Sequence, residues 1–218
     1  LFQSDMLHMN ADGYALWRPI VATLLRAWSS GRGQSLLFDF GPADATTEYG
    51  PSPDDPANFW NNVTEVIGTS PTGQLRGLVN TRGAQSSVGF QIIDPFNASG
   101  PNSNGALESA VFPANATRDS LYGNTEPWNG YENVLPRFKL LRLNPERTYT
   151  FTFYASRLGV GDVREASYTV TGANAGSVVF DAANNVDGVA TVAGIVPDAR
   201  REIVVSLAPT GRNNNSYH

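Results

Sequence analysis

The sequence predicts a mainly β fold: an antiparallel β-sandwich or jelly roll preceded by one amphipathic α-helix. Three observations lead to this class. Only residues 10–28 of the 218-residue chain place apolar side chains at helical spacing. From residue 35 onward, apolar and polar residues alternate in short segments that Gly, Asn, Asp and Pro turns separate. Because no crossover helices lie between these segments, the pattern argues against a doubly wound parallel sheet.

The predicted helix over residues 10–28 has one apolar stripe. Its members recur at intervals of three and four residues: Tyr14, Trp17, Val21, Leu24 and Trp28. Asn10 is a suitable N-cap, and the Asp12 carboxylate complements the positive end of the helix dipole. Pro19 falls inside the pattern, so we expect a kink or a fresh start there. The Gly- and Ser-rich segment 29–35 then ends the helical periodicity.

The strand candidates follow from residue 35 onward. The clearest is 147–157, where Tyr149, Phe151 and Phe153 alternate with threonines. Such alternation suits a strand with one face in a core and the other near water. The other candidates are 35–41, 74–80, 87–94, 137–144, 166–172, 176–182, 188–195 and 201–209.

The change of periodicity divides the chain into two unequal domains, residues 1–30 and residues 31–218. Two long segments of the second domain, 42–72 and 95–135, are rich in Pro, Gly and Asn. Loops of this length are usually functional or ordered by local helical turns. We expect one such helical turn within 55–68.

The composition restricts the classes of partner. The net charge is −5, and the 15 basic residues are scattered without a stripe that would neutralise a run of phosphates, so a nucleic-acid partner is not expected. No apolar stretch approaches the roughly 20 residues that span a bilayer. Cysteine is absent, and the Gly, Pro, Asn, Ser and Thr content with 16% charged residues resembles that of exported bacterial β-sandwiches. We therefore expect a secreted or periplasmic protein.

The segment “SDMLHMNADGYALW” (4–17) carries a carboxylate and a histidine three residues apart. A serine hydrolase needs a base to take the hydroxyl proton and a second group to fix the imidazole tautomer. Asp5 and His8 supply both if their loop folds back on itself. The alternative is that His8 is a capping or surface histidine beside a helix start.

The stretch from Ser4 to Leu25, with Asp5, His8, Asn10, Gly13 and Tyr14 in place, resembles the last motif block of the SGNH (GDSL-type) hydrolases. The resemblance implies that His8 is the general base and Asp5 its orienting partner in the hydrolysis of an acyl or acetyl ester, often on a carbohydrate. In that family the nucleophilic serine lies in a Gly-Asp-Ser-like block far upstream. Because no such block and no G-x-S-x-G occurs here, we expect a C-terminal fragment that is inactive alone and partners a missing N-terminal α/β catalytic region.

The second domain resembles the β-sandwiches appended to carbohydrate-active and SGNH-type enzymes. The resemblance rests on “LLFDFGP”, “FWNNVTE”, “YTFTFYASR”, “REASYTVTG”, “FDAANN” and “VPDARREIVVSLAP”. It implies a galactose-binding-like or jelly-roll domain that holds the enzyme near a glycan or an acylated carbohydrate, or braces the catalytic domain. The alternative function is therefore a non-catalytic carbohydrate-binding or structural module.

Binding of a sugar requires an exposed aromatic face with nearby amides and carboxylates. The segment “NTEPWNGYEN” (124–133) supplies Trp128 and Tyr131 among polar neighbours, which include Glu126, Asn129 and Asn133. Trp60, in “NFWNN”, is the second candidate. The alternative is that Trp60 and Trp128 plug the ends of the sandwich, since tryptophan is highly buried on average.

No cofactor is expected. Acidic turns at Asp54, Asp55 and 181–187 permit a structural Ca²⁺, but acidic turns are commoner than calcium sites and no EF-hand spacing supports one.

Overall fold

The computed structural model describes residues 35–41, 49–52, 55–64, 74–75, 77–97 and 102–218. The chain divides into two compact units, Leu1–Ser35 and Leu36–His218, and all the described helices and strands belong to the second. The predicted helix over 10–28, Asp5 and His8 lie outside the described residues.

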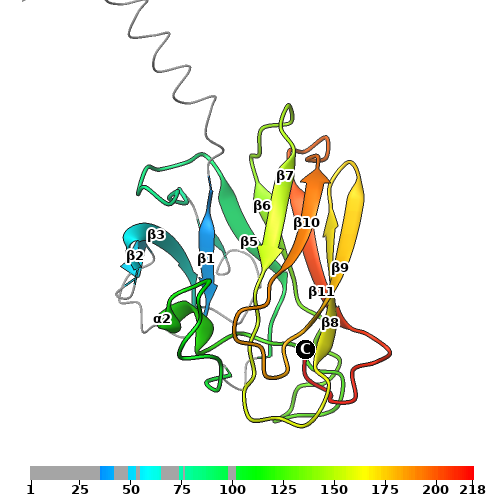
Figure 1. The fold of residues 1–218 in the computed structure, drawn as a ribbon. Helices are drawn as coiled ribbons and strands as arrows, with labels where there is room; N and C mark the ends of the chain where they lie inside the picture. The colour runs from blue at the N-terminus through cyan, green and yellow to red at the C-terminus, as the bar shows by residue number, and fades with distance from the viewer. Residues whose placement is uncertain (1–34, 42–48, 53–54, 65–73, 76, 98–101) are drawn as a thin grey trace, which may run out of the picture. The chain divides into compact units, whose positions relative to one another are not determined.

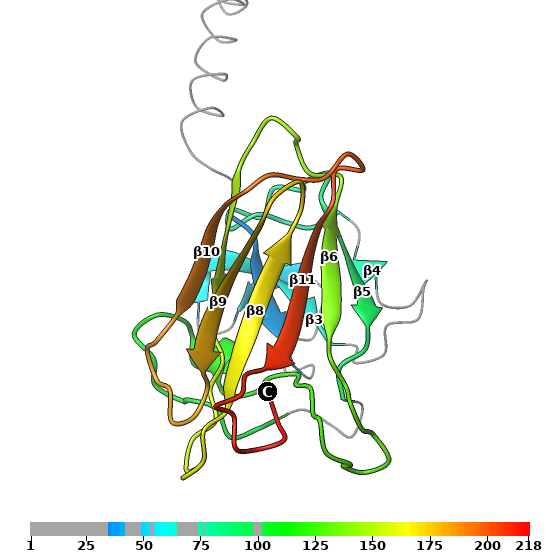
Figure 2. The ribbon, with the colours of Figure 1, turned by 90° about the vertical axis from the view of Figure 1, so that its right-hand side faces the viewer.

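The first layer of the second unit is a six-stranded antiparallel sheet. Its strands, in spatial order, are β4 (Gln74–Leu75), β5 (Gly89–Asp94), β6 (Arg137–Leu141), β11 (Ile203–Pro209), β8 (Glu165–Thr171) and β9 (Ala175–Asp181). Figure 2 shows these strands side by side. The mainly β, antiparallel class predicted from the sequence is confirmed.

The second layer consists of two smaller sheets (Figure 1). One pairs β7 (Tyr149–Phe153) with β10 (Ala190–Ile195), and the other has the order β1 (Leu37–Phe40), β3 (Asp55–Val63) and β2 (Tyr49–Ser52). Strand β1 runs parallel to β3, whereas β2 runs antiparallel to it. The ring of Phe153 on β7 stacks on Tyr168 of β8 with centroids 4.6 Å apart, so the β7–β10 sheet packs face to face on the larger sheet.

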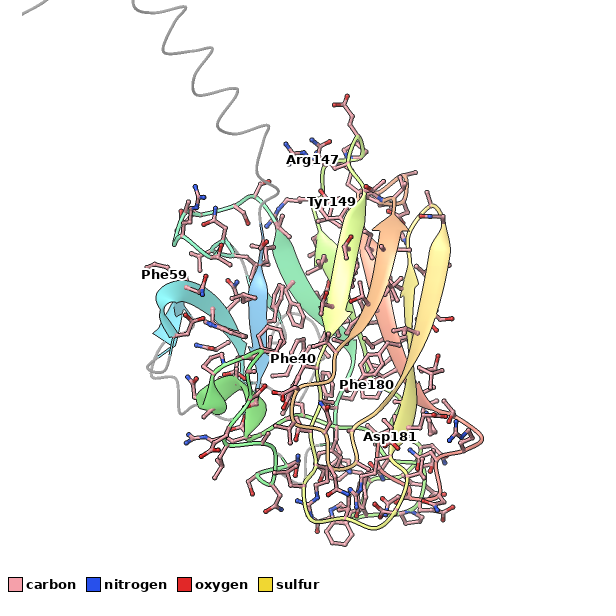
Figure 3. All side chains as sticks on the ribbon, in the orientation of Figure 1. Phe40, Phe59, Arg147, Tyr149, Phe180 and Asp181 are labelled. Carbon is pink, nitrogen blue, oxygen red and sulfur yellow. The ribbon has the colours of Figure 1, made fainter. Side chains whose placement is uncertain are left out.

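The core between the layers is rich in aromatic residues. The Phe90 ring on β5 lies 5.2 Å from that of Phe138 on β6 and 5.6 Å and 5.8 Å from those of Phe38 and Phe40 on β1. Figure 3 shows Phe40 among these inward-pointing side chains. Phe90 is 1% exposed, and full burial of a phenylalanine side chain stabilises a fold by about 1.5–3 kcal/mol. This cluster therefore contributes strongly to the packing of the two layers.

The helical turn expected within 55–68 is not formed over residues 55–64, where the structure has strand β3 (Asp55–Val63); residues 65–68 lie outside the described part of the chain. The reason is tertiary. The buried Asn61 side chain donates to the carbonyls of Leu37 and Val79 and accepts from the Val79 amide, at 2.9–3.0 Å. These long-range bonds, together with pairing to β1 and β2, override the turn-like local sequence.

The long segments show one further difference and one agreement. The strand predicted over 74–80 is reduced to β4, and Val79 instead forms an isolated bridge with Gln85. The long segment 95–135 contains a short helix, α2 (Ala114–Thr117), of the kind expected for such loops. Within the described part of the chain, no helix has the length and apolar character needed to cross a membrane.

Candidate functional site

The segment predicted to carry an exposed aromatic face forms a hairpin, here called the aromatic hairpin (residues 124–134). Its turn is closed by the amide of Trp128 donating to the carbonyl of Tyr131 at 2.7 Å and by the reverse bond at 2.9 Å. Asn129 and Gly130, between them, both have positive φ values, 49° and 87°. Two positive φ values define a type I′ turn, for which Asn-Gly is a preferred pair. Because Trp128 and Tyr131 lie directly opposite each other, their side chains project from the same face.

A bulge follows the turn. Trp128 pairs with Tyr131 and Asn124 pairs with Val134. The first arm therefore has one more residue between these two pairs than the second arm. Asn133, next to Val134, has a φ of 54°. Bulges increase local twist and re-aim side chains, and they are frequent beside functional sites.

The stem of the aromatic hairpin is held by a buried amide pair. Asn124 is fully buried, and its Nδ2 donates to the carbonyls of Glu126 at 2.7 Å and Tyr131 at 2.9 Å. Its Oδ1 accepts from Nδ2 of Asn97, also fully buried, at 2.5 Å. Since both arms of the hairpin bond to one side chain, the backbone that carries the aromatic residues is preorganised.

Residues 213–218, here called the terminal segment, add a third strand-like element to the stem. Gly123 and His218 exchange two backbone hydrogen bonds, at 2.7 Å and 3.1 Å, and the Thr125 amide donates to the Ser216 carbonyl at 3.0 Å. The Trp128 and Tyr217 rings meet edge to face, with centroids 5.9 Å apart and an interplanar angle of 85°.

Trp128 and Tyr131 remain accessible despite these contacts, and we call this pair the aromatic platform. Trp128 is 50% exposed and Tyr131 is 39% exposed. Their sequence neighbours Glu126, Asn129 and Glu132 are also exposed. The aromatic hairpin therefore presents apolar ring surface together with exposed residues that carry carboxylate and amide groups.

Trp60, the second aromatic candidate, lies in the interior. It is 4% exposed, its Nε1 donates to Oδ2 of Asp55 at 3.2 Å, and its ring packs edge-on against Phe112 at 5.8 Å. No face of this indole is open to a ligand, so Trp60 is left out of the site. The alternative that both tryptophans are buried at the ends of the sandwich therefore fits the burial of Trp60 but not the exposure of Trp128.

In the acidic turn at 181–187, the carboxylate of Asp181 bonds to backbone amides. Oδ1 of Asp181 accepts from the amides of Arg164 and Ala183, both at 2.9 Å. Among the described residues, no group of three or more His, Cys, Asp or Glu side chains is arranged to hold a metal ion. Asp54 lies outside those residues.

Three residues of the site were not predicted from the sequence: Asn97, Asn124 and Tyr217. The Asn-Gly pair between two aromatic residues was a usable signal for a type I′ hairpin. No local pattern pointed to Asn97 or Tyr217, because both reach the hairpin through tertiary contacts.

His218 lies against the hairpin stem. A Cβ atom built on Gly123 would come within 2.6 Å of its Nε2, and neither ring nitrogen meets hydrogen-bond geometry with a described residue. Burial lowers the pKa of His218 to about 4, and the nearby Ser216 backbone opposes this shift only in part. The folded protein therefore favours the neutral imidazole.

This burial predicts a loss of stability in mild acid. The pKa of His218 falls from 6.5 in the unfolded chain to about 4 in the folded one, so the unfolded state binds the proton first. The contribution of His218 to the free energy of unfolding is therefore highest above pH 6.5. It decreases by on the order of 3 kcal/mol as the pH falls to 4. Urea denaturation at pH 7 and pH 4.5 measures it, and His218→Gln is expected to lose less stability between these pH values than the wild type.

The pH at which stability is lost distinguishes the effect of His218 from that of the Asp162 carboxyl group. The hydrogen bond from Arg164 is the main cause that lowers the pKa of Asp162 below 3.8, so its contribution to stability is lost only at more acidic pH. An unchanged pH dependence in His218→Gln would contradict the assignment to His218.

Comparison with known proteins finds no matching family model, no similar curated protein and no similar solved structure.

Proposed function

We propose that the β-sandwich is a carbohydrate-binding module whose aromatic platform stacks on the apolar face of a pyranose ring. The observation that carries the proposal is the half-exposed indole of Trp128 on a rigid turn. Tryptophan is highly buried on average, and an indole held open to solvent forgoes the stabilisation that burial would supply. Binding of a sugar recovers that stabilisation.

The polar neighbours support a neutral sugar. Exposed carboxylates at Glu126 and Glu132 and the exposed amide of Asn129 supply acceptors and donors for hydroxyl groups. Two carboxylates on the same hairpin repel uronate or sulfate groups, so we infer a neutral glycan, with or without acyl substituents.

The rigid backbone of the aromatic hairpin also supports the proposal. The type I′ turn and the Asn124 hydrogen bonds fix the backbone before a ligand arrives. Less conformational entropy is then lost on binding, which favours affinity at a small contact surface.

Isothermal titration calorimetry with soluble neutral polysaccharides tests the glycan site. Trp128→Ala is expected to weaken binding by at least about 10-fold, because truncating a central aromatic anchor typically costs 2 kcal/mol or more. Val179→Ala is the matched control, since Val179 is also 50% exposed but lies on β9. Equal affinities of the wild type and Trp128→Ala would overturn the proposal. A preference for a polyuronate would overturn the inference of a neutral glycan.

We propose further that the sandwich accompanies an SGNH-type esterase domain, in which Asp5 orients His8 as general base. The support is the resemblance of the Asp5–His8 block to that family. The test is hydrolysis of p-nitrophenyl acetate by a longer chain that carries the family's serine-bearing domain ahead of this sandwich. His8→Ala in that chain is expected to abolish hydrolysis while glycan affinity stays the same. Retained hydrolysis would contradict the role of His8.

A further inference from the structure

The type I′ turn alone does not determine the orientation of the Trp128 indole. The type I′ turn fixes the backbone of Trp128 but leaves its χ1 and χ2 torsions free to change rotamer. Among the described aromatic rings, the only one in contact with the indole is that of Tyr217. This edge-to-face contact therefore selects one indole orientation while half of the side chain stays exposed.

Tyr217 is itself held from several sides. The ring of Tyr122 meets it edge to face at 5.5 Å, and the guanidinium carbon of Arg164 lies 5.5 Å from its centroid. The Tyr217 amide donates to Oδ1 of Asn215 at 3.1 Å, and its carbonyl accepts from Nδ2 of Asn213 at 3.0 Å. Both the ring and the backbone of Tyr217 are therefore fixed.

The cation over the Tyr217 ring is held by an ion pair. Nε and one terminal nitrogen of Arg164 donate to the two carboxylate oxygens of Asp162, at 2.9 Å and 3.1 Å. Nδ2 of Asn215 donates to the same carboxylate at 2.5 Å. The bidentate pair fixes the guanidinium next to the start of β8, and the Asn215 bond ties the terminal segment to the same carboxylate.

We infer that Tyr217 is a positioning residue of the glycan site: it holds the Trp128 indole in the orientation that stacks on the sugar. This inference rests on the proposed function. Without Tyr217, the indole samples several rotamers and loses that freedom on binding. Immobilising one such side chain on binding corresponds to a loss of affinity of about 3- to 10-fold.

Two substitutions separate the ring from the hydroxyl group. Tyr217→Phe keeps the ring that meets Trp128, so its affinity is expected to stay within about twofold of wild type. Tyr217→Leu removes the ring and is expected to bind about 3- to 10-fold more weakly. In the Trp128→Ala background, Tyr217→Leu is expected to have no further effect on affinity, because the side chain that it positions is gone.

A measurement without glycan separates this inference from the proposed function. ¹⁵N relaxation of the Trp128 indole N–H is expected to show an ordered side chain in the wild type and in Tyr217→Phe, and a disordered one in Tyr217→Leu, at unchanged backbone shifts in the β-sheets. If the wild type binds no glycan and Tyr217→Leu still loses the order of the indole, the proposed function alone is overturned. Unchanged indole order and affinity in Tyr217→Leu would overturn the role of Tyr217 alone. Loss of the β-sheet shifts in Tyr217→Leu would also overturn it, in favour of a purely structural role.

Discussion

Replacing Phe90 with alanine is expected to lower the free energy of unfolding by about 3–5 kcal/mol. Phe90 is 1% exposed and lies where the two layers meet, with the rings of Phe38, Phe40 and Phe138 within 6 Å of its own. The substitution removes contacts to both layers at once and leaves a cavity that rigid neighbours fill only in part. Urea denaturation followed by far-UV circular dichroism measures the loss.

Val179→Ala is the control for this prediction. Val179 is 50% exposed, so its truncation is expected to change the free energy of unfolding by less than about 0.5 kcal/mol. A loss below about 1 kcal/mol in Phe90→Ala would mean that the layers do not pack through this aromatic cluster.

The second large effect is expected for Asn124→Ala. The change leaves the carbonyls of Glu126 and Tyr131 without the Asn124 amide and removes the acceptor of the Asn97 amide. Each polar group left unsatisfied in a buried site costs about 1–3 kcal/mol, and relaxation of the hairpin limits the sum to about 2–4 kcal/mol. Thermal unfolding measures this loss, and hydrogen exchange of the hairpin amides locates it.

Asn129→Gly is the matched control for stability on the same hairpin. It also removes an amide side chain, but at an exposed position whose φ of 49° glycine adopts readily. Its expected effect is within about 0.5 kcal/mol. Equal losses in Asn124→Ala and Asn129→Gly would show that the buried amide pair does not hold the hairpin.

The strands that the sequence predicted correctly are those in which alternation is local. The candidates 147–157 and 201–209 contain β7 and β11, because every second side chain in them meets the core. Strand β3 was missed because its sequence is rich in Pro and Asn, and its pairing depends on bonds that Asn61 makes to distant carbonyls.

The two tryptophans show a similar limit for the site. Trp60 and Trp128 both have Asn neighbours, yet one is 4% exposed and the other 50%. The difference arises from tertiary packing: Phe112 and Asp55 enclose Trp60, whereas Trp128 lies at the tip of a hairpin. Local sequence therefore identified the platform residues but not which indole faces solvent.

Glycan binding on the aromatic platform is the proposal on which the role of Tyr217 also depends. Its most direct test is a ¹H–¹⁵N spectrum of the four tryptophan indoles during titration with a soluble neutral polysaccharide. We predict that the Trp128 indole signal shifts and saturates with the hairpin amides, while the Trp60 signal stays in place. A saturating shift at another surface, with the Trp128 signal unmoved, would show that the glycan does not bind on the aromatic platform.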